Sequence, residues 1–344
     1  MINEPISLYV FYPSVFLLSL GLSLYLMPGL LKAAVQWGMV DRPDGRLKHQ
    51  AAPVPFMGGI VIFLSFLITL AVATQFSPFI VGSLLGGTVI IMVGLIDDFG
   101  KLRPGQKFVG QILASLIMIK AGVHMDLPLV EGNALANDAV NIVITLFWYL
   151  SITNAINLID IMDGLSGSVT LAACAVMTVL AFLNHSYDVA ALSLGLGGAI
   201  LGFLRYNWKP ARVYLGDTGS MFIGLILGAL SVMLRYSTTN VTACVGPVLI
   251  MGVPLFDTLL VMIARKRKGK SPFLGGPEHT ALQLRRRGMS EPSIALLAGG
   301  ATLLLGGLAV VNTMLSEAAG LVVVGASVVL GLVCLVLMLK LEQD

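Results

Sequence analysis

Runs of about 17 to 25 mainly apolar residues recur along the whole chain. A helix of about 20 residues is needed to cross the ~30 Å hydrocarbon core of a bilayer, where the backbone must satisfy its own hydrogen bonds. Charged residues make up only 11% of the 344 residues, against about a quarter in an ordinary soluble domain. The sequence therefore predicts an all-α integral membrane protein, built as a single polytopic domain over residues 1–344.

We expect about eleven transmembrane helices. Their approximate ranges are 8–31, 57–75, 79–96, 107–121, 139–157, 165–183, 189–205, 218–236, 241–264, 292–314 and 318–340. Basic residues decide the orientation, because loops rich in Lys and Arg stay on the cytoplasmic side. All but two of the 21 Lys and Arg residues, Lys120 and Arg235, fall on one side of this layout. The N-terminus is therefore expected outside and the C-terminus in the cytoplasm.

Five polar stretches follow odd-numbered spans, so the layout places all of them on the cytoplasmic face. They cover residues of about 32–56, 97–106, 158–164, 206–217 and 265–291. The carboxylates at these span ends are Asp97, Asp98, Asp160, Asp163 and Asp217. Charges near hydrocarbon are unfavourable without partners, and neighbouring carboxylates repel unless a cation bridges them. One such carboxylate is equally well explained by solvation, but five on one face predict a site.

The donor types and their spacing indicate what this site binds. Oxygen ligands without sulfur favour Mg²⁺, and basic residues beside them favour a polyphosphate. In "NLIDIMDG", Asn157, Asp160 and Asp163 are three residues apart, so a helix would place them on one face before Gly164 ends it. The adjacent Asp97 and Asp98 cannot share a face. We expect one of them to point at the site and the other to coordinate or cap.

Several motifs, in this order, resemble those of a known enzyme family. "DDFGK", "NAINLIDIMDGLSG", "VYLGDTGSMFIG" and "GVPLFDT" are similar to motifs of the polyprenyl-phosphate N-acetylhexosamine-1-phosphate transferases. The resemblance runs from about residue 38 to residue 290, and the eleven-span layout agrees with it. A resemblance to the GlcNAc-1-phosphate branch is indicated, rather than to the muramoyl-pentapeptide branch, for the reason given below.

The resemblance implies an enzyme that transfers a HexNAc 1-phosphate, by default GlcNAc 1-phosphate, from a UDP-sugar to polyprenyl (undecaprenyl) phosphate and releases UMP. It implies Mg²⁺, or Mn²⁺, as the cofactor. It also implies a bacterial inner-membrane protein with a cytoplasmic active site, acting at the first membrane step of cell-envelope polysaccharide synthesis. A homodimer would resemble relatives, and no nucleic-acid partner is expected.

The motifs also carry roles over to single residues. Asp217 resembles the metal-binding aspartate, with Asn157 as a second ligand or neighbour. Asp97 or Asp98 resembles the residue that activates the lipid phosphate, either as a base or by positioning it. Asp160 and Asp163 are catalytic candidates that would orient nucleotide, sugar or metal. The substrate-binding candidates are Lys48, Lys101, Asn157, Arg285 and Arg286.

The stretch "PEHTALQLRRRG" resembles the family's histidine motif. His279 stands at the first histidine and is a catalytic, phosphate-binding candidate. The usual following histidines are replaced by Ala281 and Leu282, which argues against a muramoyl-pentapeptide substrate. Asp257 lies eight residues inside its span, where a carboxylate needs a partner, so a paired structural role is expected, although a catalytic role stays open.

Two other classes of function are less well supported. An ion-coupled transporter would also need carboxylates in the membrane, but its site would lie near the midplane between repeats. Here no repeat is evident, and the polar loops gather on one face. A non-catalytic scaffold would leave the carboxylate set unexplained. Another UDP-HexNAc, or UDP-MurNAc-pentapeptide, stays open as the donor.

Overall fold

The computed structural model of the chain describes residues 5–41, 53–234, 236–237, 240–271 and 276–342. Its longer helices are α1 (Pro5–Gln36), α2 (Gly58–Ala73), α3 (Pro78–Asp98), α4 (Pro104–Lys120), α5 (Ala134–Ile159), α6 (Leu165–Leu183), α7 (Tyr187–Asn207), α8 (Gly216–Met233), α10 (Gly252–Arg267), α12 (Glu291–Met314) and α13 (Glu317–Leu341). The shorter elements are the 3₁₀-helix η1 (Val241–Val245), α9 (Gly246–Ile250), α11 (Thr280–Arg286) and the strands β1 (Val40–Asp41) and β2 (Val54–Pro55).

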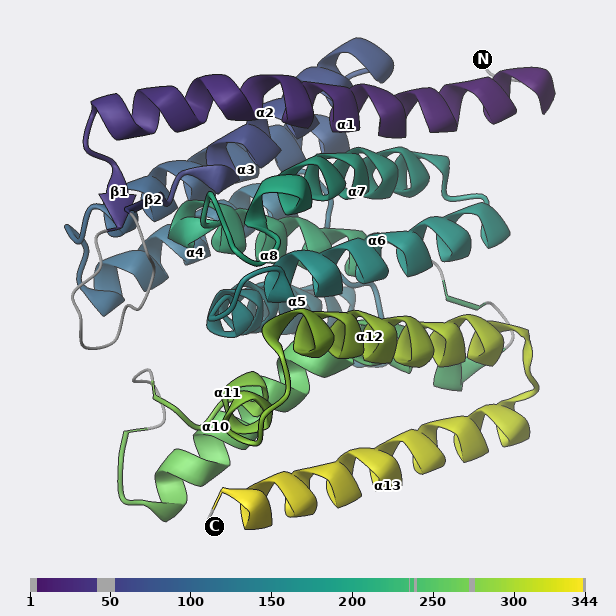
Figure 1. The fold of residues 1–344 in the computed structure, drawn as a ribbon. Coiled ribbons are helices and arrows are strands. Elements are labelled where there is room, and N and C mark those ends of the chain that lie inside the picture. Colours follow the sequence, from purple (N-terminus) through teal and green to yellow (C-terminus); the bar gives the residue numbers. More distant parts are fainter. Residues whose placement is uncertain (1–4, 42–52, 235, 238–239, 272–275, 343–344) are drawn as a thin grey trace.

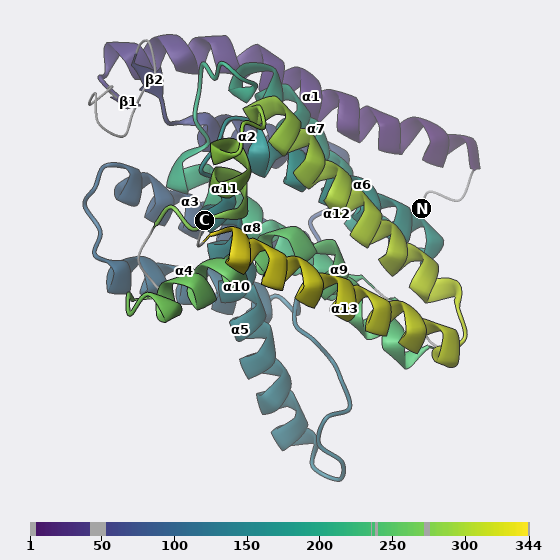
Figure 2. The ribbon, with the colours of Figure 1, turned by 60° about the horizontal axis from the view of Figure 1, so that its bottom comes forward.

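Different parts of the chain lie at the two ends of the helical bundle. The N-terminus lies at one end, and the C-terminus, α11 and the antiparallel pair of β1 and β2 lie at the other (Figure 1). The beginning of α5 projects from the bundle, with the connection from α4 folded beside it (Figure 2). The architecture is that of an all-α membrane protein, as the sequence predicted.

The count of eleven spans is not confirmed. In the described ranges, eight helices are long and apolar enough to cross a membrane, and one bent pair raises this number to nine at most. The expected spans 57–75 and 107–121 correspond to α2 and α4. These helices have 16 and 17 residues, fewer than the ~20 that a span typically needs. Apart from the segment 241–264, the apolar runs located the long helices, but they did not reveal how far each helix extends.

The bent pair replaces the straight span expected over residues 241–264. Val241–Ile250 and Gly252–Arg267 meet at an angle of 70°. Pro254 lacks the N–H that would bond to the carbonyl of Ile250 in a continuous helix, which favours a break at this point. Depth in the membrane therefore cannot be counted along this segment as it can along a straight helix.

α8 is among the most buried helices, and it packs against α2, α3 and α5. Small residues allow these backbones to approach closely, as is common in membrane proteins. A Cβ atom on Gly94 of α3 would lie only 2.5 Å from the Cα of Thr218, and one on Gly224 would lie 2.5 Å from the Cα of Thr153 in α5. The close packing fixes the start of α8 against the end of α3, where the predicted carboxylates lie.

Candidate functional site

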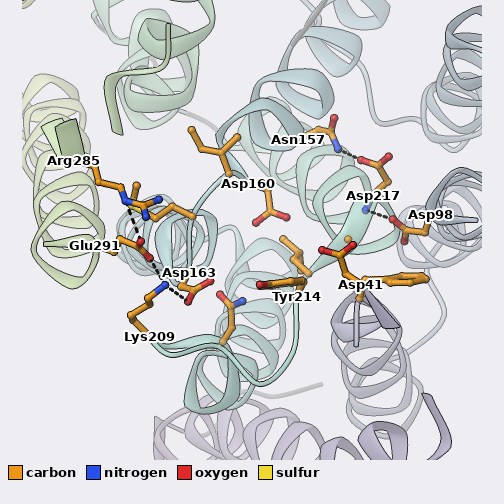
Figure 3. A pocket seen from close by; sticks show the side chains of 16 residues that line it. Asp41, Asp98, Asn157, Asp160, Asp163, Lys209, Tyr214, Asp217, Arg285 and Glu291 are labelled. Atoms are coloured by element: carbon orange, nitrogen blue, oxygen red, sulfur yellow. Dashed lines mark hydrogen bonds and ion pairs between the residues drawn. The ribbon is translucent and has the colours of Figure 1, made fainter. Parts of the chain in front are cut away.

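A polar cavity of about 710 Å³ lies among the ends of α3, α5 and α7 and the beginnings of α8 and α12. Asp98, Asn157 and Asp217 lie on one side of it, and Lys209, Arg285 and Glu291 lie on the other (Figure 3). The side chain of Asp160 lies between the two groups (Figure 3). The cavity therefore brings together residues from all five predicted polar stretches, because Asp41 and Phe56 of the first stretch line it too.

Asp98, the last residue of α3, caps the N-terminus of α8. Its Oδ1 accepts a hydrogen bond from the N–H of Asp217 at 2.7 Å, and its Oδ2 accepts one from the N–H of Thr218 at 3.0 Å. Leu215, at the N-cap position of α8, makes no side-chain capping bond. The unpaired N–H groups and positive dipole end of α8 are thus stabilised by a carboxylate from another helix.

Lys107, in the first turn of α4, bridges two carboxylates. Its Nζ lies 2.7 Å from Oδ2 of Asp97 and 3.0 Å from Oδ2 of Asp217. The Nδ2 of Asn157 donates to Oδ1 of Asp217, and it also donates to the Oγ of Ser220 at 2.8 Å. Side chains from α3, α4 and α5 therefore converge on the first turn of α8 and fix the position of Asp217.

The helical face predicted for Asn157, Asp160 and Asp163 is wrong. α5 ends at Ile159, Asp160 is its C-cap, and Asp163 lies in the turn that precedes α6. Gly164 has a φ of 74° and is the N-cap of α6, so it begins a helix and does not end one. All three polar side chains still line the cavity, because the turn reverses the chain beside it.

The remaining candidates divide into those that the cavity includes and those that it does not. The cavity is lined by Asp98, Asn157, Asp160, Asp163, Asp217 and Arg285. Asp97 does not line it but contacts Lys107, which also contacts Asp217, so the two adjacent aspartates have different partners. Lys101, His279 and Arg286 do not line the cavity, and Lys48 lies outside the described residues.

Lys101 and Arg286 are exposed and have other contacts. The Nζ of Lys101 lies 5.5 Å from the ring centroid of Phe99. The Nη2 of Arg286 donates to the carbonyl oxygen of Pro277 at 2.9 Å. Their substrate-binding roles stay predictions.

His279 is buried against α10. Its Nδ1 lies 2.7 Å from Oδ2 of Asp257, and the N–H of Thr280 donates to Oδ1 of Asp257 at 2.7 Å. The partner expected for Asp257 is therefore confirmed, and the pair attaches the beginning of α11 to α10. Only 3% of the His279 side chain is exposed, so the structure does not show it within reach of a ligand. Its phosphate-binding role stays a prediction.

Besides Asp41, which lines the cavity from β1, three charged residues beside or in the cavity were not predicted as site residues: Lys107, Lys209 and Glu291. The two lysines were counted only among the residues that set the orientation. The sequence could have indicated these three residues, because each lies within a few residues of the end of an apolar run. A charge placed there needs a partner, and here the partners are the carboxylates and cations of the site.

Burial, together with the negative charges of Asp217, Asp98 and Asp163, raises the pKa of Asp160 from 3.8 to about 8. The folded protein therefore retains a proton that the unfolded chain releases above its ordinary pKa. Because the unfolded chain loses this proton first, the free energy of unfolding should fall as the pH rises from about 4 to about 8. Above pH 8 the contribution of Asp160 to this free energy should no longer change with pH.

The variant Asp160→Asn removes this titration. With divalent cations chelated, we expect the melting temperature of the wild type in detergent to fall between pH 5 and pH 8 by more than that of Asp160→Asn. Above about pH 8 the two curves should run parallel, because the folded carboxyl group is then ionised too. Parallel curves over the whole range would contradict the raised pKa.

The chemistry of the cavity suits a hard cation. Among the residues that the structure describes, no three His, Cys, Asp or Glu side chains are placed to hold a metal ion. The donors that line the cavity near Asp217 are nevertheless carboxylate and amide oxygens without sulfur, which are the ligands that Mg²⁺ prefers. The residues present thus fit the cofactor that the motifs implied.

A second cavity, of about 900 Å³, lies between α1, α6, α7 and α12. Leu20, Leu171, Leu201 and Leu303 are among its lining residues, and Arg205 is its one charged lining residue. None of the predicted site residues lines it. The polar cavity is therefore the candidate active site.

Comparison with known proteins agrees with the motifs. A family model described as glycosyl transferase family 4 matches residues 80–235. The chain is 34% identical over 255 residues to the "probable undecaprenyl-phosphate N-acetylglucosaminyl 1-phosphate transferase" of Bacillus subtilis, which covers 73% of this chain and 70% of that protein. It is 33% identical over 296 residues to the decaprenyl-phosphate N-acetylglucosaminephosphotransferase of Mycolicibacterium smegmatis, with coverages of 77% and 73%.

A third relative comes from the muramoyl branch. The phospho-N-acetylmuramoyl-pentapeptide-transferase of Bacillus subtilis is 31% identical over 311 residues, which cover 84% of this chain and 93% of that protein. The identity to the two N-acetylglucosamine relatives is slightly higher, in agreement with the incomplete histidine motif. The chain thus belongs to glycosyl transferase family 4, among the polyprenyl-phosphate N-acetylhexosamine-1-phosphate transferases.

Proposed function

We propose that the protein transfers N-acetylglucosamine 1-phosphate from UDP-N-acetylglucosamine to a polyprenyl phosphate and releases UMP. The observation that carries this proposal is the polar cavity in which Asp98, Asn157, Asp160, Asp163 and Asp217 meet at the ends of apolar helices. A substrate with a polar head and an isoprenoid tail can enter such a site from the membrane, while a sugar nucleotide enters from water. The names of the relatives support the polyprenyl-phosphate acceptor and the N-acetylglucosamine phosphate group that is transferred.

In this reaction an oxygen of the lipid phosphate attacks the β-phosphorus of the donor. A new P–O bond forms, the bond from the β-phosphorus to the bridging oxygen breaks, and UMP leaves with that oxygen. The second pKa of a phosphomonoester is about 6, so most of the acceptor is a dianion at neutral pH. Since the nucleophile is already deprotonated, the main demands on the protein are positioning and neutralisation of charge.

The residues around Asp217 meet these demands. Lys107 lies between Asp97 and Asp217 and can compensate the negative charge that collects when two phosphorylated substrates meet. Both carboxylate oxygens of Asp98 accept hydrogen bonds from N–H groups at the start of α8. Because these bonds occupy the oxygens that a base would use, they favour a positioning role for Asp98. Asp217 and Asn157 would hold a divalent cation, which when bound supplies further neutralisation of the phosphate oxygens.

The position of the cavity also supports an enzyme over an ion-coupled transporter. A transporter site would lie near the middle of the membrane-spanning helices. Here the cavity is lined by the last residues of α3 and α5 and by the first residues of α8 and α12. The homodimer and the bacterial inner membrane as the location belong to this proposal as well.

The proposal includes an orientation in which the cavity faces the cytoplasm and the N-terminus lies outside. We expect cysteines introduced at Ser237 and Ser271 to react with an impermeant maleimide from opposite faces, Ser237→Cys from outside and Ser271→Cys only after permeabilisation. The background for both variants must lack Cys174, Cys244 and Cys334, because Cys244 is exposed. Labelling of both positions from outside would overturn the layout.

The function itself is tested by release of UMP from purified protein over a panel of UDP-sugars, with and without polyprenyl phosphate. We expect release only when the lipid and Mg²⁺ are both present, and the highest rate with UDP-N-acetylglucosamine. A higher rate with another UDP-HexNAc would change the donor and keep the reaction. No UMP from any donor would contradict the proposal.

A further inference from the structure

Four charged side chains form a continuous chain of ion pairs along one side of the cavity. The Nζ of Lys209 lies 3.3 Å from Oδ2 of Asp163 and 2.9 Å from Oε2 of Glu291, and the Nε of Arg285 lies 3.3 Å from Oε1 of Glu291. The charges alternate in the order Arg285, Glu291, Lys209, Asp163 (Figure 3). Each residue comes from a different segment: α11, the beginning of α12, the loop after α7 and the turn before α6.

The exposure of these side chains shows which of them a ligand can reach. Glu291 is only 11% exposed, whereas Lys209 is 44% and Arg285 is 54% exposed. Asp163 is 11% exposed and also accepts a hydrogen bond from the N–H of Ala211 at 3.0 Å. The two carboxylates thus form the buried inner part of the chain, and the two cations present their remaining N–H groups to the cavity.

We propose that Glu291 is a positioning residue that holds Lys209 and Arg285 together as a two-cation clamp for a phosphate group. Glu291 uses both of its oxygens, one for each cation, and so fixes two long side chains from separate segments that would otherwise repel each other. Holding flexible side chains in the bound arrangement before the ligand arrives lowers the entropy lost on binding.

The chemistry of the opposite wall explains why an anion should bind on this side. Asp98 and Asp217 place negative charge across the cavity, with Asp160 between the walls (Figure 3). Lys209 and Arg285 are the lysine and arginine among the lining residues, so a phosphate group can bind them directly, whereas beside Asp98 and Asp217 it would need the divalent cation. Arginine and lysine N–H groups form strong charge-assisted hydrogen bonds with phosphate oxygens.

The inference rests on the proposed function, which supplies two sources of phosphate: the diphosphate of the donor and the head of the lipid acceptor. The test is Glu291→Gln, which keeps the shape of the side chain and removes its charge. We expect the KM for one of the two substrates to rise about tenfold, with the other KM and kcat changed by less than about twofold. The substrate whose KM rises is the one that the clamp binds.

Two comparisons separate this effect from a structural one. Glu317→Gln is the matched control, because Glu317 is an exposed first-turn residue of α13, as Glu291 is a first-turn residue of α12. It should leave both KM values unchanged. In a protein that carries Lys209→Met and Arg285→Met, Glu291→Gln should change KM no further, because the residue acts through the two cations.

Three results would overturn the inference: unchanged KM values in Glu291→Gln, an equal rise of both, or a full further effect in the double-methionine protein. Failure of the proposed function is recognised separately, as absence of UMP release by the wild type. In that case, the clamp is tested by comparing the binding of UDP, uridine and a short-chain polyprenyl phosphate to Glu291→Gln and to the wild type. Weaker binding of a phosphorylated ligand with unchanged uridine binding supports the clamp, and unchanged binding of all three overturns it.

Discussion

Replacement of Asp217 by asparagine is expected to lower kcat by about 10²–10³-fold, the loss typical of removing one preorganised charge from an active site. Asp217 is the point at which Lys107 and Asn157 converge, and it is the residue proposed to hold the divalent cation. The variant keeps the shape of the side chain. Its backbone N–H, which donates to Asp98, is unaffected by the change.

The melting temperature in detergent should change by only a few degrees, because the carboxylate lies at a cavity and supports no apolar core. Asp126→Asn is a suitable control, since Asp126 is an exposed aspartate in the connection between α4 and α5. The measurement is turnover at saturating substrates over a range of Mg²⁺ concentrations. Near wild-type turnover of Asp217→Asn at saturating Mg²⁺ would contradict the assignment.

Gly94→Ala is expected to damage both stability and activity, although Gly94 itself does not line the cavity. A Cβ atom there would lie 2.5 Å from the Cα of Thr218 and 2.7 Å from the carbonyl oxygen of Asp217. These are backbone atoms that cannot rotate away, so α3 and α8 must separate. Overpacking of this kind destabilises a fold by about 1–3 kcal/mol.

The separation would also pull Asp98, one turn further along α3, from the N–H groups of Asp217 and Thr218. A displacement near 1 Å in an active site can reduce the rate on the order of 10²-fold. The control is Gly21→Ala in α1, where an added Cβ meets no heavy atom within 4 Å. The account of the α3–α8 contact would be wrong if Gly94→Ala matched Gly21→Ala in both melting temperature and turnover.

The sequence predicted the parts of this protein that depend on local pattern. Runs of apolar residues located the long helices, and the polar residues at their ends were predicted as a site, of which Asp98, Asn157, Asp160, Asp163 and Asp217 do line one cavity. The extent of each helix was harder to predict, because the apolar run in a membrane helix does not show where the helix stops. α5 therefore ends before Asp160, and the expected helical face around it is replaced by a turn.

Contacts between distant segments could not be predicted from spacing. Asp98 and Asp217 are 119 residues apart in sequence, and only the packing of α3 on α8 shows that one caps the helix of the other. The same applies to Glu291, whose partners Lys209 and Arg285 come from two other segments. A charge next to an apolar run indicates that a partner exists, but the identity of that partner is a property of the fold.

The fate of the β-phosphate of the donor tests the central claim most directly. The purified protein is given UDP-N-acetylglucosamine labelled in the β-phosphate, together with polyprenyl phosphate and Mg²⁺, and the lipid and aqueous phases are separated. Transfer of sugar 1-phosphate predicts that the label enters the lipid and that unlabelled UMP appears in equal amount. Recovery of the label in water as UDP, with the sugar alone on the lipid, would contradict the account.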